Sequence, residues 1–177
     1  YMPHPNGHRE TLREATQAAH TAAENVWFGA GQFASLTDYH AWLTRMLEVH
    51  EALGLTAAAS VSSDHFLLTE TARCMALRRD LHAEPDVRKP ESGGSESHAW
   101  GVLYALNGSA LGASHIHREI SKLPNWPILY LAEMRGYATS GGVKTFFDEL
   151  NTASLDADDA LSGALEVFDR ISAAKTA

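Results

Sequence analysis

The chain has little of what secreted, membrane-spanning or nucleic-acid-binding proteins need. Its single cysteine, Cys74, cannot form a disulfide within the chain. No apolar run approaches the ~20 residues that a membrane span requires, and residues 1–8 do not have the pattern of a secretion signal. With 14 lysines and arginines against 22 aspartates and glutamates, a general attraction to phosphates is missing. We therefore predict a cytoplasmic protein that binds neither nucleic acid nor a membrane.

What the chain does have is enough apolar sequence for one core. Its 177 residues are 45% hydrophobic and 20% charged, which is typical of a single globular domain. Residues 1–8 are expected to be a disordered or tag-proximal N-terminus, and residues 9–174 to form the domain. Residues 84–95, which contain Pro90 and two glycines, are the expected flexible loop.

Apolar residues recur at spacings of three and four, which is the period of a helix with one buried face. A second helix is expected to begin at the caps in residues 35–38 and to end at Gly54. An apolar segment, 143–150, follows two glycines, and no segment alternates as a strand would. The sequence therefore predicts an all-α, single-domain helical bundle of six to eight helices. The other predicted helices are 9–27, 66–81, 96–118, 128–138 and 157–173.

One side of the first predicted helix carries residues that could bind an iron-containing ligand. Arg13, His20 and Glu24 are spaced by whole turns of a helix. A neutral His20 can bind iron through one ring nitrogen, while Glu24 accepts a hydrogen bond from the other. Arg13 could reach an anionic group on the same ligand. The alternative interpretation of this spacing is a partly exposed histidine with an ordinary helical partner.

The fourth predicted helix has a strip without side chains larger than a methyl group, formed by Gly101, Ala105, Gly108 and Gly112. An interior glycine costs a helix about 1 kcal/mol relative to alanine, so a packing or binding role should offset this cost. Such a strip allows another helix to cross closely, or allows a flat ligand to lie against the backbone. Together with His20, it favours a planar macrocycle with an iron centre and acidic side arms.

Two segments of the chain resemble the heme oxygenase family. Residues 12–25 look like the first helix of these enzymes, with His20 at the place of the proximal histidine. Residues 100–112 look like the bent distal helix of the bacterial, biliverdin-producing members. The shorter segments 79–81 and 146–150 are also similar, so the resemblance covers most of the predicted domain.

The resemblance implies that heme, as both cofactor and substrate, is held between the first and fourth helices. It implies an oxidoreductase that uses dioxygen and reductant to convert heme to biliverdin, carbon monoxide and ferrous iron. A ferredoxin or a flavoprotein would donate the electrons, and a homodimer is left open. The implied heme-binding residues are His20, which is also the metal ligand, Glu24, Arg13, Tyr104 and Lys144, and the implied catalytic residues are Gly108, Ser109 and Gly112.

Three positions depart from the family's pattern. Ser109 stands where mammalian enzymes have an aspartate, and Asn107 where bacterial relatives commonly have a glutamate. Gln17 stands where several relatives have a basic residue. The Ser109 hydroxyl can still orient water. The missing carboxylates nevertheless favour an alternative function, a non-catalytic heme-oxygenase-like protein that binds heme or another ligand as a sensor or regulatory module.

Other chemically active residues are expected to be structural. A ferritin-like di-iron site needs paired Glu-x-x-His motifs, which the chain lacks. Cys74 is expected to be a small core residue. A cluster of arginines is predicted to form a solvated basic face, with docking of an acidic redox partner as the alternative: Arg73, Arg78 and Arg79. Three histidines are expected at the surface: His50, His115 and His117.

Overall fold

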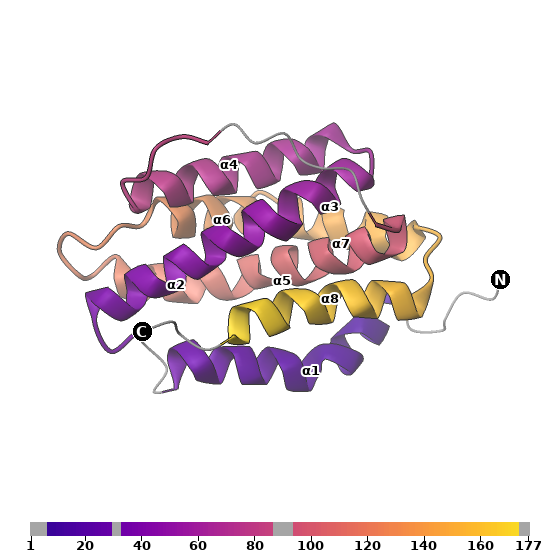
Figure 1. Cartoon of the computed structure of the whole chain (residues 1–177), viewed down its shortest axis with the longest axis horizontal. Helices are drawn as coiled ribbons and strands as arrows, with labels where there is room; N and C mark the ends of the chain where they lie inside the picture. Colours follow the sequence, from indigo (N-terminus) through magenta and orange to yellow (C-terminus); the bar gives the residue numbers. More distant parts are fainter. Residues whose placement is uncertain (1–6, 30–32, 87–93, 174–177) are drawn as a thin grey trace.

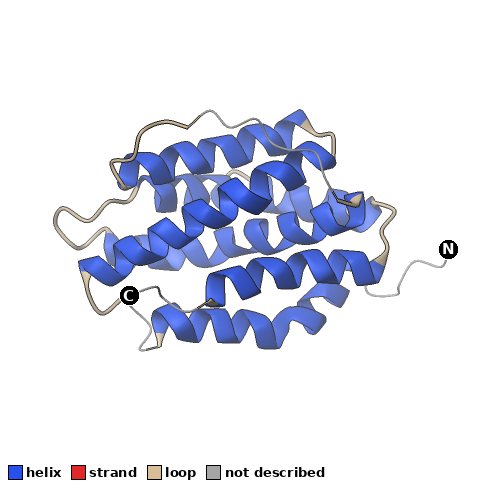
Figure 2. Ribbon diagram, in the orientation of Figure 1, coloured by secondary structure: helices blue, strands red, loops and turns tan. Residues whose placement is uncertain are grey.

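The computed structural model describes residues 7–29, 33–86 and 94–173, and within these ranges it is all-α, as predicted (Figure 2). None of the helices in these ranges is both long enough and apolar enough to cross a membrane. The elements are α1 (Gly7–Phe28), α2 (Leu36–Val49), the π-helical turn η1 (His50–Gly54), α3 (Leu55–Ser60), α4 (Asp64–Asp80), α5 (Glu96–Ile120), α6 (Leu129–Thr139), α7 (Gly142–Thr152) and α8 (Ala157–Ser172).

Helix α5 forms the centre of the bundle and contacts α3, α6, α7 and α8. Every residue from 99 to 107 is buried, because this half of α5 is surrounded by other helices. From Gly108 onward only one side of α5 is buried. Helices α1 and α8 pack against each other along one edge of the molecule, and α4 lies at the opposite edge (Figure 1). The second half of α5 is therefore free to form the wall of a site.

Helix α8 crosses the first half of α5 so closely that both crossing points require glycine. A methyl group at Gly101 would overlap the carbonyl oxygen of Ala160, and one at Gly163 would overlap that of His98. This part of the predicted glycine strip thus serves helix packing.

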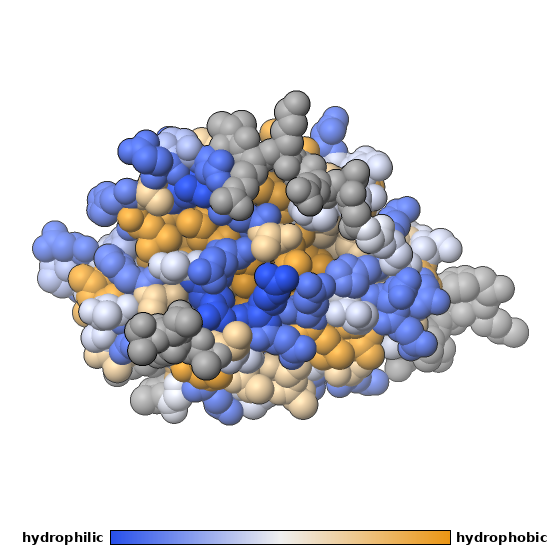
Figure 3. Space-filling view, viewed as in Figure 1, coloured by the Kyte–Doolittle hydropathy of each residue, from blue (hydrophilic) through white to orange (hydrophobic). Residues whose placement is uncertain are grey.

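Side-chain hydrogen bonds stabilise several helix ends, including the predicted cap at residue 35. The Ser35 hydroxyl accepts a hydrogen bond from the Asp38 N–H, and the Asp156 carboxylate accepts one from the Asp159 N–H. At the other end of α8, Arg45 donates to the carbonyl oxygens of Arg170 and Ala173. Hydrophilic side chains lie over this junction of α2 with α8 in Figure 3.

Two predicted boundaries are wrong. Gly54 does not end the second helix, because the chain continues through η1 and α3 to Ser60. A methyl group at Gly54 would overlap the Glu70 carboxylate, so this glycine makes room for a neighbouring helix. Helix α1 begins at Gly7, inside the predicted N-terminal segment, because the Asn151 side chain accepts a hydrogen bond from the Arg9 N–H. Residues 1–6, and residues 87–93 of the predicted loop, lie outside the described residues.

Candidate functional site

Two cavities meet where α1, α5 and α8 come together. The first has a volume of about 290 Å³ and the second about 300 Å³. Each alone is at the lower end of the roughly 300–1,000 Å³ range of small-molecule sites. Together they form one candidate site, because they share a set of lining residues: His20, Gly108, Ser109, Leu111 and Phe168.

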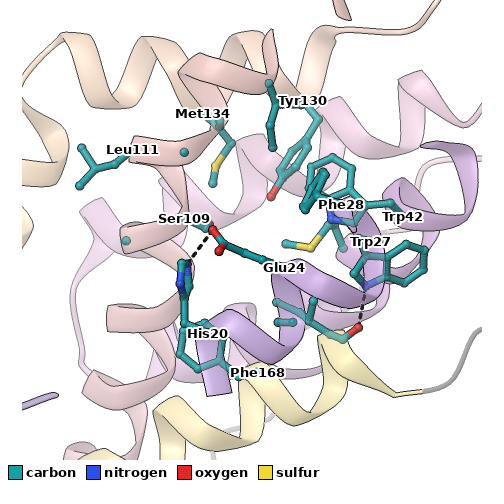
Figure 4. A pocket seen from close by; sticks show the side chains of 17 residues that line it. His20, Glu24, Trp27, Phe28, Trp42, Ser109, Leu111, Tyr130, Met134 and Phe168 are labelled. Atoms are coloured by element: carbon teal, nitrogen blue, oxygen red, sulfur yellow. Dashed lines mark hydrogen bonds and ion pairs between the residues drawn. The ribbon is translucent and has the colours of Figure 1, made fainter. Parts of the chain in front are cut away.

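The first cavity is mainly apolar and aromatic (Figure 4). Its polar side chains include Glu24 from α1, Ser109 from α5 and Tyr130 from α6. A cavity of this kind excludes water and keeps a few polar groups in defined positions. Its large apolar residues come from α1, α2, α5, α6 and α8, and they include Trp27, Phe28, Trp42, Met46, Leu111, Ile116, Met134, Phe168 and Ile171.

The second cavity is basic at one end. It is lined by Arg9 and Arg13 from α1 and by Tyr104 from α5. The Arg9 guanidinium lies 4.0 Å from the centre of the Phe147 ring, a cation–π contact that orients it. Arg13 forms an ion pair of 3.6 Å with Glu10. This cavity is suited to acidic groups.

His20 stands between the two cavities and is accessible from them. Its Nε2 lies 3.6 Å from Glu24 Oε1, and the two side chains are 48% and 57% exposed (Figure 4). The ring meets Phe168 edge to face, with 5.6 Å between the ring centres. The aromatic contact holds the imidazole, while its exposure leaves it available to a ligand.

Gly108 and Gly112 line the first cavity, whereas Gly101 packs against another helix. A methyl group added at either one would meet nothing within 4 Å. Between them, the Ser109 hydroxyl donates a hydrogen bond of 2.6 Å to the Leu106 carbonyl oxygen, so its lone pairs remain for the cavity. This part of the strip is an open backbone surface at the cavity, with no side chain of its own between the helix backbone and the cavity at these two positions.

The structure brings most of the predicted site residues together. His20, Glu24, Gly108, Ser109 and Gly112 line the first cavity, and Arg13 and Tyr104 line the second. Lys144 is not brought to either cavity; its side chain is 82% exposed and bonds Asp148 at 2.6 Å. Sequence reasoning missed Arg9, although it lies one helical turn before Arg13.

Two expectations about surface residues are wrong. His50 is completely buried and bonded to Glu70, and Arg73, predicted on a basic face, is also completely buried. Asn107 is buried against Arg73 and lines neither cavity. Cys74 is buried as predicted, and burial raises the pKa of its thiol. Within the described ranges, no group of three or more histidine, cysteine or acidic residues could hold a metal ion.

Comparisons with known proteins agree with this geometry. A family model described as heme oxygenase matches residues 8–172. Among solved structures, the fold is similar to that of a heme oxygenase from Neisseria meningitidis in its NO- and CO-bound forms, with a TM-score of 0.68. The two sequences are 21% identical, and the match covers 93% of this chain and 88% of that one, so the likeness concerns the fold. No curated protein matches the chain.

Proposed function

Because the chain belongs to the heme oxygenase family, we propose that it binds heme in the two joined cavities and degrades it to biliverdin, carbon monoxide and ferrous iron. The observation that carries this proposal is the placement of an accessible His20 in the same cavity as Gly108 and Gly112. The His20 imidazole would hold the iron, and the two glycines leave space for a flat ring.

The residues of both cavities fit heme. Heme would supply the redox-active iron and would also be the substrate. His20 offers one ring nitrogen to the iron, and Glu24 can hold the proton of the other after a small adjustment from the observed 3.6 Å. Arg9 and Arg13 provide positive charge for the acidic side arms in the second cavity.

The first cavity would shield the reacting centre. Its apolar walls exclude bulk water, while the hydroxyl groups of Ser109 and Tyr130 can hold individual water molecules. We further propose that a ferredoxin or a flavoprotein donates the electrons.

One observation favours the second candidate function, a non-catalytic heme-binding sensor or regulatory module. Asn107 stands where a glutamate is common in bacterial relatives, and it is buried: its amide donates to the Leu103 carbonyl and accepts from Arg73. Among the described residues that line the two cavities, Glu24 is the only one with a carboxylate.

Hemin titration followed by reduction separates these functions. We expect a Soret band to form on addition of hemin, and a bilin spectrum to replace it when reductant is added in air. A Soret band that persists under reductant would support the sensor. If no Soret band forms, both heme functions are wrong.

His20→Ala tests the axial ligand in the same titration. This variant should lose the wild-type ligand-field spectrum, because His20 is the only histidine among the described residues that line the cavities. His65→Ala is the matched control, since His65 is exposed on α4 and lines neither cavity. An unchanged spectrum in His20→Ala would remove His20 from its proposed role.

A further inference from the structure

Three aromatic side chains form a stack that begins at the first cavity. Trp42, from α2, is one of the lining residues, and Figure 4 shows it among them. The centre of its ring lies 6.0 Å from that of Tyr39, with 21° between the two ring planes. The ring of Tyr39 in turn stacks with that of Trp126, with 5.3 Å between the centres and 24° between the planes. Aromatic rings at these separations are in contact.

The stack connects the cavity with the surface. Trp126 belongs to the segment between α5 and α6, lines neither cavity and is only partly buried, whereas Tyr39 is completely buried. The Tyr39 hydroxyl donates a hydrogen bond of 2.7 Å to the Pro127 carbonyl oxygen, which fixes the Trp126 segment beside Tyr39. One end of the stack therefore forms part of the cavity wall, and the other end is accessible to solvent.

The residue types of the stack suit the transfer of electrons. Indole and phenol rings give up an electron much more readily than a phenyl ring does. Phe28 and Phe33 also contact the Trp42 ring, at 5.9 Å and 5.4 Å between centres, but their phenyl rings are too difficult to oxidise. An electron that replaces one lost from Trp42 can therefore come from Tyr39, and then from Trp126.

Tyr39 passes the oxidised state on because it cannot release its proton. An oxidised phenol is stabilised when a base takes its proton, but the Tyr39 hydroxyl points at a backbone carbonyl oxygen, which is not a base. Burial, and to a smaller extent the Asp80 carboxylate, raise the pKa of this hydroxyl. Trp126 is partly exposed, so water can accept a proton from its ring. The oxidised state is therefore more stable at Trp126 than at Tyr39.

We propose that Trp42, Tyr39 and Trp126 carry oxidising equivalents from the first cavity to the surface, where a soluble reductant such as ascorbate consumes them. This inference rests on the proposed function, because bound heme would react with peroxide at the cavity. Hydrogen peroxide takes up two electrons and two protons and becomes two molecules of water. For each electron, the Trp126 indole loses one electron through the stack and its Nε1 proton to water. Ascorbate then returns one electron and one proton to the indole.

Peroxide treatment of the hemin-loaded protein tests the path, with mass spectrometry as the readout. In the absence of ascorbate we expect oxygenation of the Trp126 ring, and Trp42→Phe should abolish it. Trp100→Phe is the matched control and should change nothing, because Trp100 is buried and lines neither cavity. The rings in contact with Trp100 are those of Phe66 and Phe146. The Soret band gives the hemin content to which each yield is normalised.

Tyr39→Phe tests the middle of the stack. It keeps the shape of the stack but removes the readily oxidised ring, so oxygenation of Trp126 should fall in this variant as well. If the stack serves packing alone, Trp126 is oxidised according to its own exposure, and equal yields in wild type, Trp42→Phe and Tyr39→Phe would overturn the proposal. Oxidation that ends at Tyr130, whose ring lies 5.9 Å from that of Trp42, would also overturn it.

A photo-oxidant attached at the cavity tests the path without heme. Leu111→Cys provides a thiol at a position that lines both cavities and is 53% exposed, whereas Cys74 is only 7% exposed. The thiol is labelled with a ruthenium(II) diimine complex, and after a flash a cobalt(III) ammine removes one electron from the excited complex. The oxidised complex then takes one electron from the protein. We expect a tryptophan radical in transient absorption that both Trp126→Phe and Trp42→Phe remove.

The two experiments distinguish failure of the path from failure of the proposed function. If hemin does not bind but the light-induced radical forms at Trp126, the proposed function is wrong and the path is confirmed. If hemin binds but Trp126 is oxidised in neither experiment, the path is wrong.

Discussion

Two histidine–glutamate pairs of this protein have opposite environments. His20 and Glu24 are one turn apart on α1, lie 3.6 Å from each other and are about half exposed. His50 and Glu70 are 20 residues apart, lie 2.6 Å from each other and are 0% and 1% exposed. The exposed pair can rearrange around a ligand at little cost, whereas the buried pair cannot lose either member without leaving a polar group unsatisfied. The same two residue types thus form an accessible pair at a cavity in one place and a buried link between packed elements in the other.

The largest expected effect comes from removing the buried carboxylate. Glu70→Ala leaves Arg73 buried without its ion-pair partner, so the free energy of unfolding should fall by about 3–5 kcal/mol. Urea denaturation measures the change. Glu24→Ala is the matched control and should change stability by less than about 0.5 kcal/mol. If both variants lose the same free energy of unfolding, the buried and exposed pairs do not differ in stability as proposed.

The two carboxylates should also differ in how they affect stability in acid. The pKa of Glu70 is lower in the folded than in the unfolded chain, so the unfolded chain binds more protons in acid. The stabilisation is present above the ordinary carboxyl pKa of about 4.3 and is lost as the pH falls through the lowered folded value. In urea titrations below about pH 4, the stability gap between wild type and Glu70→Ala should narrow by up to about 1.4 kcal/mol per pH unit. The difference in stability between wild type and Glu24→Ala should stay constant over the same pH range. If the stabilities of all three proteins change with pH in parallel, this account is wrong.

The smallest effect is expected from a change at the exposed Glu24, and it should appear in hemin affinity rather than in stability. Glu24→Gln keeps the shape of the side chain but weakens the acceptor beside His20. Hemin affinity should fall about tenfold, as for partners that orient a metal-binding histidine, with the urea midpoint unchanged. Spectral titration measures the affinity. A variant that binds hemin like the wild type would show that Glu24 does not orient His20.

Local sequence patterns predicted most of the fold, and they predicted the candidate site in part: residue spacing indicated Arg13, His20, Glu24 and the glycine strip, whereas Tyr104 and Ser109 were implied by the resemblance. Helical periodicity and the cap at Ser35 predicted the α-helices, and turn spacing placed His20 beside Glu24. Gly54 was predicted to end a helix because glycine often does so, whereas its actual role depends on Glu70 approaching from α4. Lys144 lies on the outer side of α7, and nothing in its neighbouring residues distinguishes this from a place in the site.

By itself, the sequence determined the relations that a single helix imposes: which residues share a face, where a helix is capped, and that Arg13, His20 and Glu24 follow one another by turns. Tertiary structure alone decided that Gly101 packs against α8 while Gly108 opens on a cavity, and that His50 is buried. The physical reason is that helix geometry depends on residues a few positions apart, whereas burial depends on which distant segment covers a side chain.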